Sequence, residues 1–376
     1  MINEYPDSLN PPVLMMRSDM IKRNFEDHMR IFMDFKSPLS DRSPHWSTHS
    51  ISRRNIFTLL ALFSAGIPMA RSQERKGLVI GYLGSELPES YASRLKAFRA
   101  GLEAAGFVEG QNLAIQFRWA AGKYDQLSAL AQDLVEQNVS LIVAAGGASV
   151  ALAAKKATTS LPIVFELGGD PVALGLVDSL ARPGGNLTGI SSLSVEVSSK
   201  RLEFMHKLLP HARNFIVVGN PKSPTSERQI TNLRETAGKL EIEIDIQMPN
   251  SEASLEAIVT DFSPAHAAGI VFTSDPFFAF RSQRLAMLAA THGVPAIMQT
   301  RDFVSAGGLM SYGGDFEQSH RYTGIYAGRI LKGERPSDLP VQLVTKLEFF
   351  LNLTAAKHLG ITCPPVLLGM ADTIID

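Results

Sequence analysis

Residues 161–177 read LPIVFELGGDPVALGLV, and the pattern of this stretch changes in the middle. The first part is an apolar run with the length of a strand that is buried on both faces. Two glycines, an acid and a proline follow, and apolar residues then return at helical spacing. The stretch therefore predicts a buried parallel strand, a turn that carries the carboxylate of Asp170, and a helix over 170–185.

The same alternation of strand and helix continues on both sides of this stretch. We expect a first series of strands at 77–84, 112–120, 141–147, 162–169 and 187–192, with helices between them. A second series follows at 214–221, 241–249, 268–276, 294–300 and 308–315, then a long helix over 316–332, a strand-like 339–352 and a helix over 354–360. The second series includes a helix over 278–293. Strict alternation predicts an α/β protein with two doubly wound, Rossmann-like lobes, each built on a parallel sheet.

Composition narrows the class of protein. The 376 residues are 45% hydrophobic and 19% charged, with a formal net charge of −1. This balance fits a protein with large cores and gives no general attraction for nucleic acid or anionic lipid, so we expect no nucleic-acid partner. The chain has one cysteine, Cys363, which excludes an internal disulfide and a cysteine-rich metal site and fits a small core residue.

The N-terminal part has the pattern of an export signal. Residues 51–72 contain the pair Arg53–Arg54, an apolar stretch over 56–69, and a small-x-small sequence at 70–72. These features are typical of a twin-arginine signal peptide. A membrane anchor is the alternative, but the apolar stretch is shorter than the roughly 20 residues that span a bilayer. Because no cysteine lies directly after the stretch, we expect no lipid attachment. We interpret 1–50 as a disordered extension or as sequence upstream of the true start.

Polar residues gather where the predicted strands end. Asp170, Asn220 and Asp275 each follow a predicted strand and precede a proline. A proline suits the first position of a helix, so these three residues are candidates for helix N-caps. In open α/β sheets ligands also bind at the carboxyl ends of the strands. Capping and ligand binding are therefore both open for each of the three.

The surroundings of Asp170 favour a ligand. Gly168 and Gly169 allow close approach of a ligand to the backbone, and the helix that begins after 141–147 offers free amides. Free amides suit a carboxylate, and an acid opposite them suits an ammonium group. Together these groups would suit a zwitterion.

Chemical catalysis finds little support in the sequence. The motifs GxGxxG, GxxxxGK[ST], HExxH and GxSxG are absent after every predicted strand. A metal cluster of Asp170, Asp275 and Asp315 would lack histidine or cysteine partners at ligand spacing, so we expect neither a metal nor a cofactor. Besides simple binding of a small molecule, two functions stay open: an enzyme with Asp170 and Asp275 as acid and base, and the ligand-sensing module of a regulatory system.

Several segments resemble a known family. They are YLGS (82–85), FRAGLEAAGFVEGQN (98–112), IVAAGGASVALAAKKAT (142–158), the block 162–191 with GDPVALGLV and LARPGGN, and YGGD (312–315). Over about residues 77–370 the chain resembles ABC-transporter substrate-binding proteins with the type I periplasmic-binding fold, in the branch that includes tryptophan and phenylalanine receptors.

The resemblance implies an architecture and partners. The two lobes would be joined by three hinge segments near 190–196, 311–316 and 340–346. Lobe 1 would comprise 77–190 with 314–340, and lobe 2 would comprise 196–310 with 344–376. The family implies a monomer in the periplasm that binds a small molecule, passes it to an ABC permease in the inner membrane, and uses no cofactor.

The resemblance also implies ligand-binding residues between the lobes. They are Ser85, Gly147, Ala148, Ser149, Asp170, Asn220, Asp275, Thr300, Tyr312 and Asp315. We expect Asp170 or Asp315 to face the ammonium group of an amino acid, and Ser85 with the amides of 147–149 to meet its carboxylate. Trp119, Phe277 and Phe278 either stack on an aromatic ligand or pack against helices.

Overall fold

A computed structural model of the protein describes residues 77–376. The predicted export signal at 51–72, with its pair Arg53–Arg54, and the predicted extension at 1–50 lie outside the described residues. Among the residues that are described, no helix is both long enough and apolar enough to cross a membrane.

The first lobe contains a six-stranded sheet in which every neighbouring pair is parallel. The spatial order is β2 (Leu113–Trp119), β1 (Leu78–Gly84), β3 (Leu141–Ala145), β4 (Ile163–Leu167), β5 (Leu187–Ser191) and β11 (Gln342–Leu343). The register of these strands places Ile80 of β1 beside Ile115 of β2 on one side and beside Leu141 of β3 on the other. The strands β3, β4 and β5 are buried along their whole length, as the apolar runs predict.

The second lobe contains a seven-stranded sheet. Its spatial order is β7 (Glu243–Gln247), β6 (Asn214–Val218), β8 (Ile270–Phe272), β9 (Ala296–Met298), β10 (Met310–Gly314), β12 (Leu347–Asn352) and β13 (Thr373–Ile375). All pairs are parallel except β10 with β12. This pair differs from the predicted parallel arrangement because β10 leads toward the first lobe and β12 returns from it.

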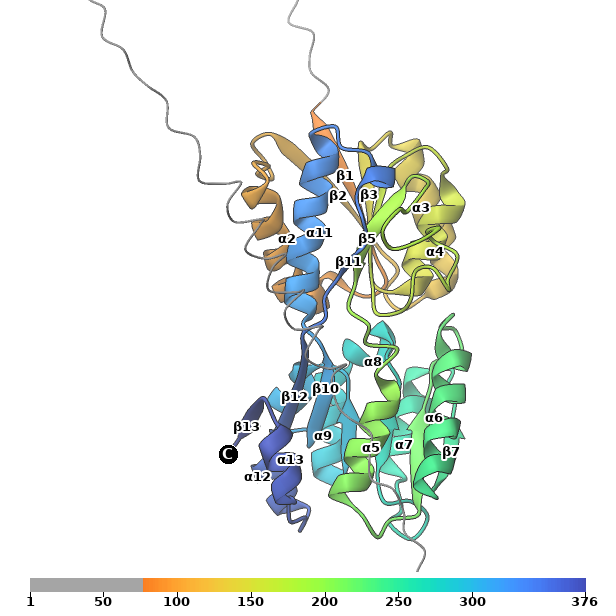
Figure 1. Cartoon of the computed structure of the whole chain (residues 1–376), viewed down its shortest axis with the longest axis vertical. Coiled ribbons are helices and arrows are strands. Elements are labelled where there is room, and N and C mark those ends of the chain that lie inside the picture. The colour runs from red at the N-terminus through yellow and green to blue at the C-terminus, as the bar shows by residue number, and fades with distance from the viewer. Residues whose placement is uncertain (1–76) are drawn as a thin grey trace, which may run out of the picture. The chain divides into compact units, whose positions relative to one another are not determined.

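Helices cover both faces of each sheet (Figure 1). Around the first sheet are η1 (Pro88–Tyr91), α2 (Ala92–Ala104), η2 (Tyr124–Gln126), α3 (Leu127–Glu136), α4 (Ala148–Ala157), α11 (Phe316–Leu331) and η3 (Pro336–Asp338). Around the second are α5 (Ser198–Leu208), α6 (Ser226–Leu240), α7 (Glu252–Thr260), α8 (Pro276–Ala279), α9 (Ser282–His292), α10 (Arg301–Ser305), α12 (Leu353–His358) and α13 (Pro365–Met370). Each face of each sheet therefore has its own apolar core.

The chain passes between the two sheets three times. It leaves the first sheet after β5 and enters the second lobe at α5. It returns after β10, because α11 packs beside α2 on the first sheet (Figure 1). It crosses again between β11 of the first sheet and β12 of the second. Segments from distant parts of the sequence thus complete each lobe.

One predicted helix is wrong, and another begins later than predicted. Residues 170–185 form turns in place of a helix, because Gly175 adopts a left-handed conformation with φ of 66° and Pro183 follows. Leu176 and Val177 are nevertheless buried in the core beside α4. The predicted helix over 278–293 is divided into α8 and α9, with Phe280 and Arg281 between them.

Of the three predicted helix N-caps, only Asp275 caps a helix. Its side chain accepts a hydrogen bond from the backbone N–H of Phe277 at the start of α8. Asp170 and Asn220 cap turns, since each accepts from the backbone N–H two residues further on. The proline pattern marks a turn in all three cases, and the residues beyond it decide whether a helix follows.

The contact between α2 and α11 has no room for side chains at its centre. A Cβ atom added to Gly101 of α2 would lie 2.0 Å from the backbone oxygen of Arg321 in α11. A Cβ atom on Gly324 of α11 would lie 2.1 Å from the backbone oxygen of Phe98. The two glycines let the backbones touch, and this contact fixes α11 to the first lobe.

Gly101→Ala should therefore force the two helices apart. We expect a loss of about 1–3 kcal/mol in the free energy of unfolding, the usual cost of overpacking a tight core. Gly238→Ala is the matched control, because this glycine lies in α6 with nothing within 4 Å of the added Cβ atom. The control should gain roughly 0.5–1 kcal/mol through helix propensity. Urea unfolding followed by circular dichroism measures both, and equal stability of the two variants would contradict the expectation.

Candidate functional site

The strand order indicates which edges of the two sheets are candidates for a ligand site. The five strands β2-β1-β3-β4-β5 and the five strands β7-β6-β8-β9-β10 follow the same doubly wound order. In this order the chain reverses direction across the sheet between the first and third strands, and ligands bind at the carboxyl ends there. Ser85 and Glu86 follow β1, and Gly146 and Gly147 follow β3. In the second lobe, Asn220 follows β6 and Asp275 follows β8.

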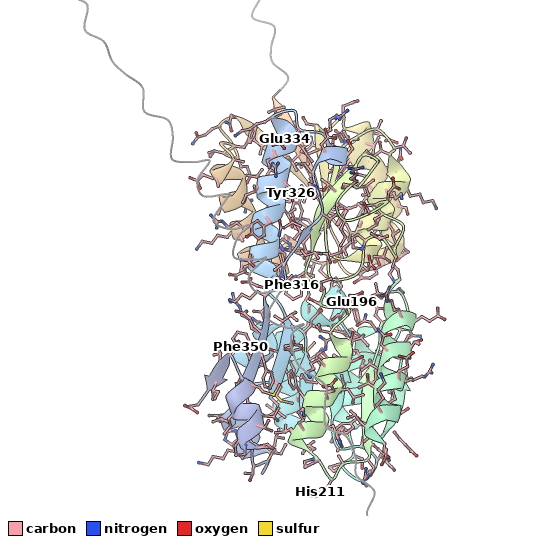
Figure 2. All side chains as sticks on the ribbon, in the orientation of Figure 1. Glu196, His211, Phe316, Tyr326, Glu334 and Phe350 are labelled. Carbon is pink, nitrogen blue, oxygen red and sulfur yellow. The ribbon has the colours of Figure 1, made fainter. Side chains whose placement is uncertain are left out.

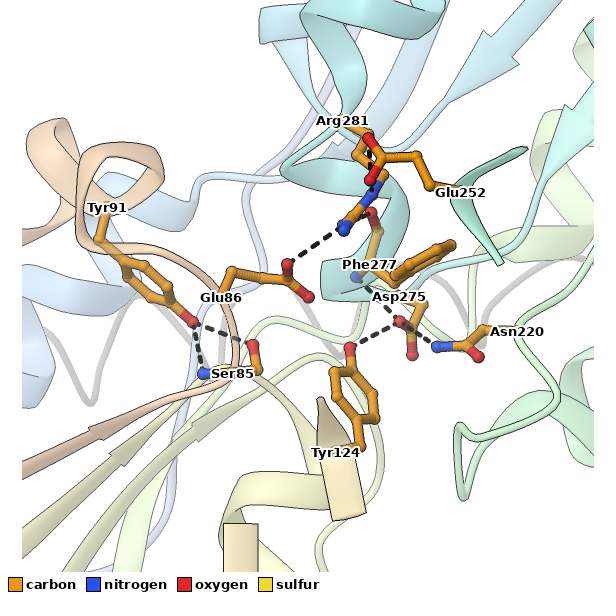
Figure 3. A network of polar contacts seen from close by, with 9 residues as sticks. All are labelled: Ser85, Glu86, Tyr91, Tyr124, Asn220, Glu252, Asp275, Phe277 and Arg281. Carbon is orange, nitrogen blue, oxygen red and sulfur yellow. Dashed lines mark hydrogen bonds and ion pairs between the residues drawn. The ribbon is translucent and has the colours of Figure 1, made fainter. Parts of the chain in front are cut away.

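Asp275 is the centre of a hydrogen-bond network between the lobes (Figure 3). Its Oδ1 atom accepts from the Phe277 N–H at 2.9 Å, from Asn220 Nδ2 at 2.9 Å and from the Tyr124 hydroxyl at 3.0 Å. The side chain is 4% exposed, and burial raises the pKa of its carboxyl although these donors oppose the rise. Since Tyr124 belongs to the first lobe, its bond joins the two lobes.

An ion pair forms a second connection. Arg281 Nη1, between α8 and α9, lies 3.1 Å from Glu86 Oε2, which follows β1 (Figure 3). The Arg281 guanidinium also lies 4.0 Å from the ring centroid of Phe277. Glu86 is 3% exposed, and burial raises the pKa of its carboxyl to about 7 although Arg281 opposes the rise. The lobes are thus held by two polar contacts on one side of the site.

A cavity lies next to this network and is lined from both lobes. The first lobe contributes Arg94, Gly146, Gly147, Ala148, Glu166, Leu167, Gly168, Gly169 and Phe316, and the second contributes Ser223, Thr225, Ser274, Asp275, Pro276, Ala279 and Gln299, with Val195 from the connecting segment. Phe316 is labelled in Figure 2, at the start of α11 between the lobes. The amide end of α4 opens on this cavity, because Gly147 is its N-cap and no side chain caps it. The wall therefore offers amide donors as well as charged side chains.

Two buried ionisable groups in this wall have no ionic partner in the part of the chain that the structure describes. The guanidinium of Arg94, on α2, lies 4.6 Å from the Phe280 ring and 4.9 Å from the Phe316 ring. Arg94 is 8% exposed and forms no ion pair within residues 77–376. Glu166, on β4, is 4% exposed, and its Oε1 atom has no hydrogen-bond partner in this part of the chain. Burial raises the pKa of Glu166 to about 7, and Arg94 opposes the rise.

A second cavity adjoins the first. The two share Arg94, Gln299 and Phe316, and the second is also lined by Thr300, Ser311 and Asp315. The hydroxyl of Thr300 is buried and has no hydrogen-bond partner among the described residues. Asp315 is the N-cap of α11, where its side chain accepts from the Gln318 N–H. Within residues 77–376, no three His, Cys, Asp or Glu side chains are placed to hold a metal ion.

The predicted site residues occupy different places. Gly147, Ala148 and Asp275 line the first cavity, and Thr300 and Asp315 line the second. Asn220 reaches the site through its bond to Asp275. Ser85 is buried and its hydroxyl lies 3.1 Å from that of Tyr91, while Ser149 lies in the first turn of α4.

Asp170 and Tyr312 lie elsewhere. Asp170 lines an adjoining open cavity with Glu196 and Arg228, and its carboxylate accepts from backbone amides of its own turn. The Tyr312 ring packs against the ring of Phe204, with 5.0 Å between the ring centroids, in an apolar core of the second lobe. A ligand role for these two stays a prediction.

The aromatic candidates pack mainly within the lobes. Trp119 stacks on Phe117 at 5.6 Å, and Phe278 is fully buried in the second lobe. Phe277 lies beneath the Arg281 guanidinium (Figure 3). For Trp119 and Phe278 the structure thus favours packing over contact with a ligand.

Sequence reasoning missed the buried charges of the site. Glu166 carries a signal that could have found it, because it is the one carboxylate inside the apolar run 162–167. Arg94 has the same character, a charge on the buried face of an amphipathic helix. Tyr124, Glu86 and Arg281 carry no such signal, since their contacts join residues from opposite lobes.

The chain is similar in sequence to proteins of known class. The sequence model of a family described as ABC transporter substrate binding protein matches residues 88–375. A protein named tyrosine-binding protein, from Clostridioides difficile strain R20291, is 29% identical over 271 residues, which cover 70% of this chain and 75% of the relative.

Solved structures show the same fold. The ABC domain from Streptococcus pneumoniae, solved in complex with L-Trp, superposes with a TM-score of 0.71 at 24% identity, over 80% of this chain and 100% of that one. A substrate binding protein with adhesive properties from Clostridium difficile, solved in a ligand-free, open form, has a TM-score of 0.56 at 25% identity, over 80% and 99% of the two chains.

The raised pKa of Glu86 predicts how stability depends on pH. Because the folded protein holds this proton up to about pH 7, whereas a free glutamate releases it near pH 4.5, the free energy of unfolding falls as pH rises through that window. Glu86→Gln cannot ionise, so its melting temperature should fall less than that of the wild type between these pH values. Glu89→Gln, at an exposed position three residues away, is the control and should follow the wild type. Parallel curves for all three proteins would contradict the assignment.

Proposed function

This chain belongs to the ABC transporter substrate-binding proteins, and on that premise we propose that it captures an amino acid between its two lobes and releases it unaltered to a membrane permease. Substrate-binding proteins of ABC importers work outside the cytoplasm, where they bind a small molecule for the transporter. What the family leaves open is the kind of molecule that this chain binds.

One observation carries the proposal of an amino acid. The cavity between the lobes contains buried groups of both charge signs, Arg94 and Glu166, together with the amide end of α4. A guanidinium and free amides suit a carboxylate, whereas a buried carboxylate suits an ammonium group. A zwitterion presents both. The name of the tyrosine-binding relative supports the same class, and the rings of Phe280 and Phe316 beside Arg94 make aromatic amino acids the first to test.

The geometry suits a receptor that closes on its ligand. A ligand in this cavity contacts both lobes at once, so its binding free energy favours the closed form over the open one. The bonds Tyr124–Asp275 and Glu86–Arg281 add contacts that exist only while the lobes are close. In this proposal binding and release need motion about the connecting segments and no bond chemistry.

The remaining parts of the proposal concern location and assembly. We propose that 77–190 with 314–340 and 196–310 with 344–376 move as the two lobes, hinged near 190–196, 311–316 and 340–346. The proposal includes export by the twin-arginine signal at 51–72, a monomer in the periplasm, and a permease in the inner membrane. The motif at Arg53–Arg54 and the family support these points.

Thermal unfolding with a panel of ligands tests the proposal. At least one amino acid should raise the melting temperature, since a ligand at 100 times its Kd stabilises the folded state by about 2.7 kcal/mol. L-tyrosine, L-tryptophan and L-phenylalanine should give the largest shifts. A dipeptide and myo-inositol serve as comparison ligands. No shift with any of the twenty amino acids, or a shift with myo-inositol alone, would contradict the proposed ligand class.

Tyr124→Phe should weaken ligand binding through the closed form. The variant loses the bond to Asp275 that joins the lobes, so the closed form becomes less favourable. We expect Kd for the best amino acid of the panel to rise about tenfold, which corresponds to about 1.4 kcal/mol. Tyr322→Phe is the control, because the Tyr322 hydroxyl has no hydrogen-bond partner within the described residues. Isothermal titration calorimetry gives both constants, and an unchanged Kd for Tyr124→Phe would show that the bond does not stabilise closure.

A further inference from the structure

Glu166 differs from the other carboxylate of the cavity in having an oxygen without a donor. Asp275 Oδ1 already accepts three hydrogen bonds, from Phe277, Asn220 and Tyr124. Glu166 Oε1 accepts none within residues 77–376, although the side chain is buried and lines the cavity. An unsatisfied buried carboxylate is costly, so this position favours a donor that enters from the cavity.

The charged and titratable groups around Glu166 do not supply that donor. Arg94 on α2 acts on Glu166 through its charge, but the two form no ion pair within 4.0 Å. The Tyr82 hydroxyl, on β1, keeps its proton because burial raises its pKa, but it has no hydrogen-bond partner among the described residues and so gives none to Glu166. His320 on α11 is buried, and burial lowers its pKa to about 3, so it carries no charge near neutral pH. Asp275, across the cavity, is itself an acid.

This arrangement fits the ammonium group of the ligand. Resting on the proposed function, we propose that Glu166 is the specificity-determining residue that receives the ligand's ammonium group, and that Glu166 gives up a proton when the ligand binds. The O–H bond of the Glu166 carboxyl breaks and its proton passes to the solvent. The carboxylate that remains accepts an N–H of the ammonium group, and Arg94 stays available for the ligand's carboxylate.

Proton release by Glu166 makes the affinity for the ligand depend on pH in one direction. Since the pKa of Glu166 is about 7 in the ligand-free protein, most molecules carry the proton at pH 6 and must lose it before the ion pair forms. The affinity should therefore rise with pH, by up to about tenfold per pH unit below pH 7, and level off above it. A zwitterionic ligand keeps its own charges across this range.

Isothermal titration calorimetry with L-tyrosine as the probe measures how many protons are released for each ligand bound. Titrations of the full chain at pH 6 in buffers with different ionisation enthalpies should show close to one proton released per ligand. Glu166→Gln should release none, bind L-tyrosine at least tenfold more weakly at pH 8, and lose the pH dependence. Glu166→Asp keeps the carboxylate and should retain the proton release. Glu256→Gln, on the surface of α7, is the control and should match the wild type.

A second probe separates the charge from the shape of the ligand. The compound 3-(4-hydroxyphenyl)propionate lacks the ammonium group of L-tyrosine. The wild type should prefer L-tyrosine to this compound, and Glu166→Gln should lose most of that preference. A merely structural role of Glu166 would lower the affinity for both compounds equally and would leave the proton count unchanged.

The outcomes are distinct. If the wild type binds L-tyrosine without releasing a proton, or if Glu166→Gln releases as many protons as the wild type, the assignment of Glu166 is overturned while the proposed function stands. If no amino acid binds the wild type, the proposed function fails and the assignment falls with it. Should Glu166→Gln not fold, the proton counts of the wild type and of Glu166→Asp decide.

Discussion

Asp275 accepts three hydrogen bonds on one carboxylate oxygen, and one of them comes from the other lobe. The bonds from Phe277 and Asn220 fix the end of β8 to the start of α8 and to the end of β6. The bond from Tyr124 then sets where the first lobe meets this rigid corner. The cavity lies beside this contact, so the bond that Asp275 makes with Tyr124 helps to set the spacing of the two walls, together with the Glu86–Arg281 pair.

The cavity combines features that a folded protein usually avoids. Arg94 and Glu166 are buried in the same wall without an ionic partner among residues 77–376, and each carries a cost of desolvation. A core built only for stability would pair these charges or replace them with apolar side chains. The arrangement fits a receptor of the ABC transporter substrate-binding family, because under the proposed function a zwitterionic ligand would supply partners to both groups. Under that proposal, the stability of the empty protein and its affinity for the ligand are opposed at the same two residues.

The path of the chain explains how such a cavity keeps its shape. Three crossings connect the sheets, and α11 returns to pack on α2 through the direct backbone contact at Gly101 and Gly324. The contact holds α11, and with it Phe316 at the edge of the cavity. Because both lobes repeat the same strand order, their ligand-binding edges can face one another across these connections. Under the proposed hinge motion, the width of the cavity would change while the packing within each lobe stays intact.

Local sequence patterns determined the strands, most helices and the class of the fold, because apolar periodicity reports burial within one element and its neighbours. The strand-end pattern singled out Asp275, and the family resemblance added Gly147 and Ala148; all three follow strands and line the cavity. The local patterns failed for 170–185, where Gly175 breaks a helical period, and they gave no sign of Tyr124 or Arg281. Only the tertiary structure decided those contacts and the isolation of Glu166, since an ion pair or an unpaired charge depends on which groups the two lobes bring together from distant parts of the chain.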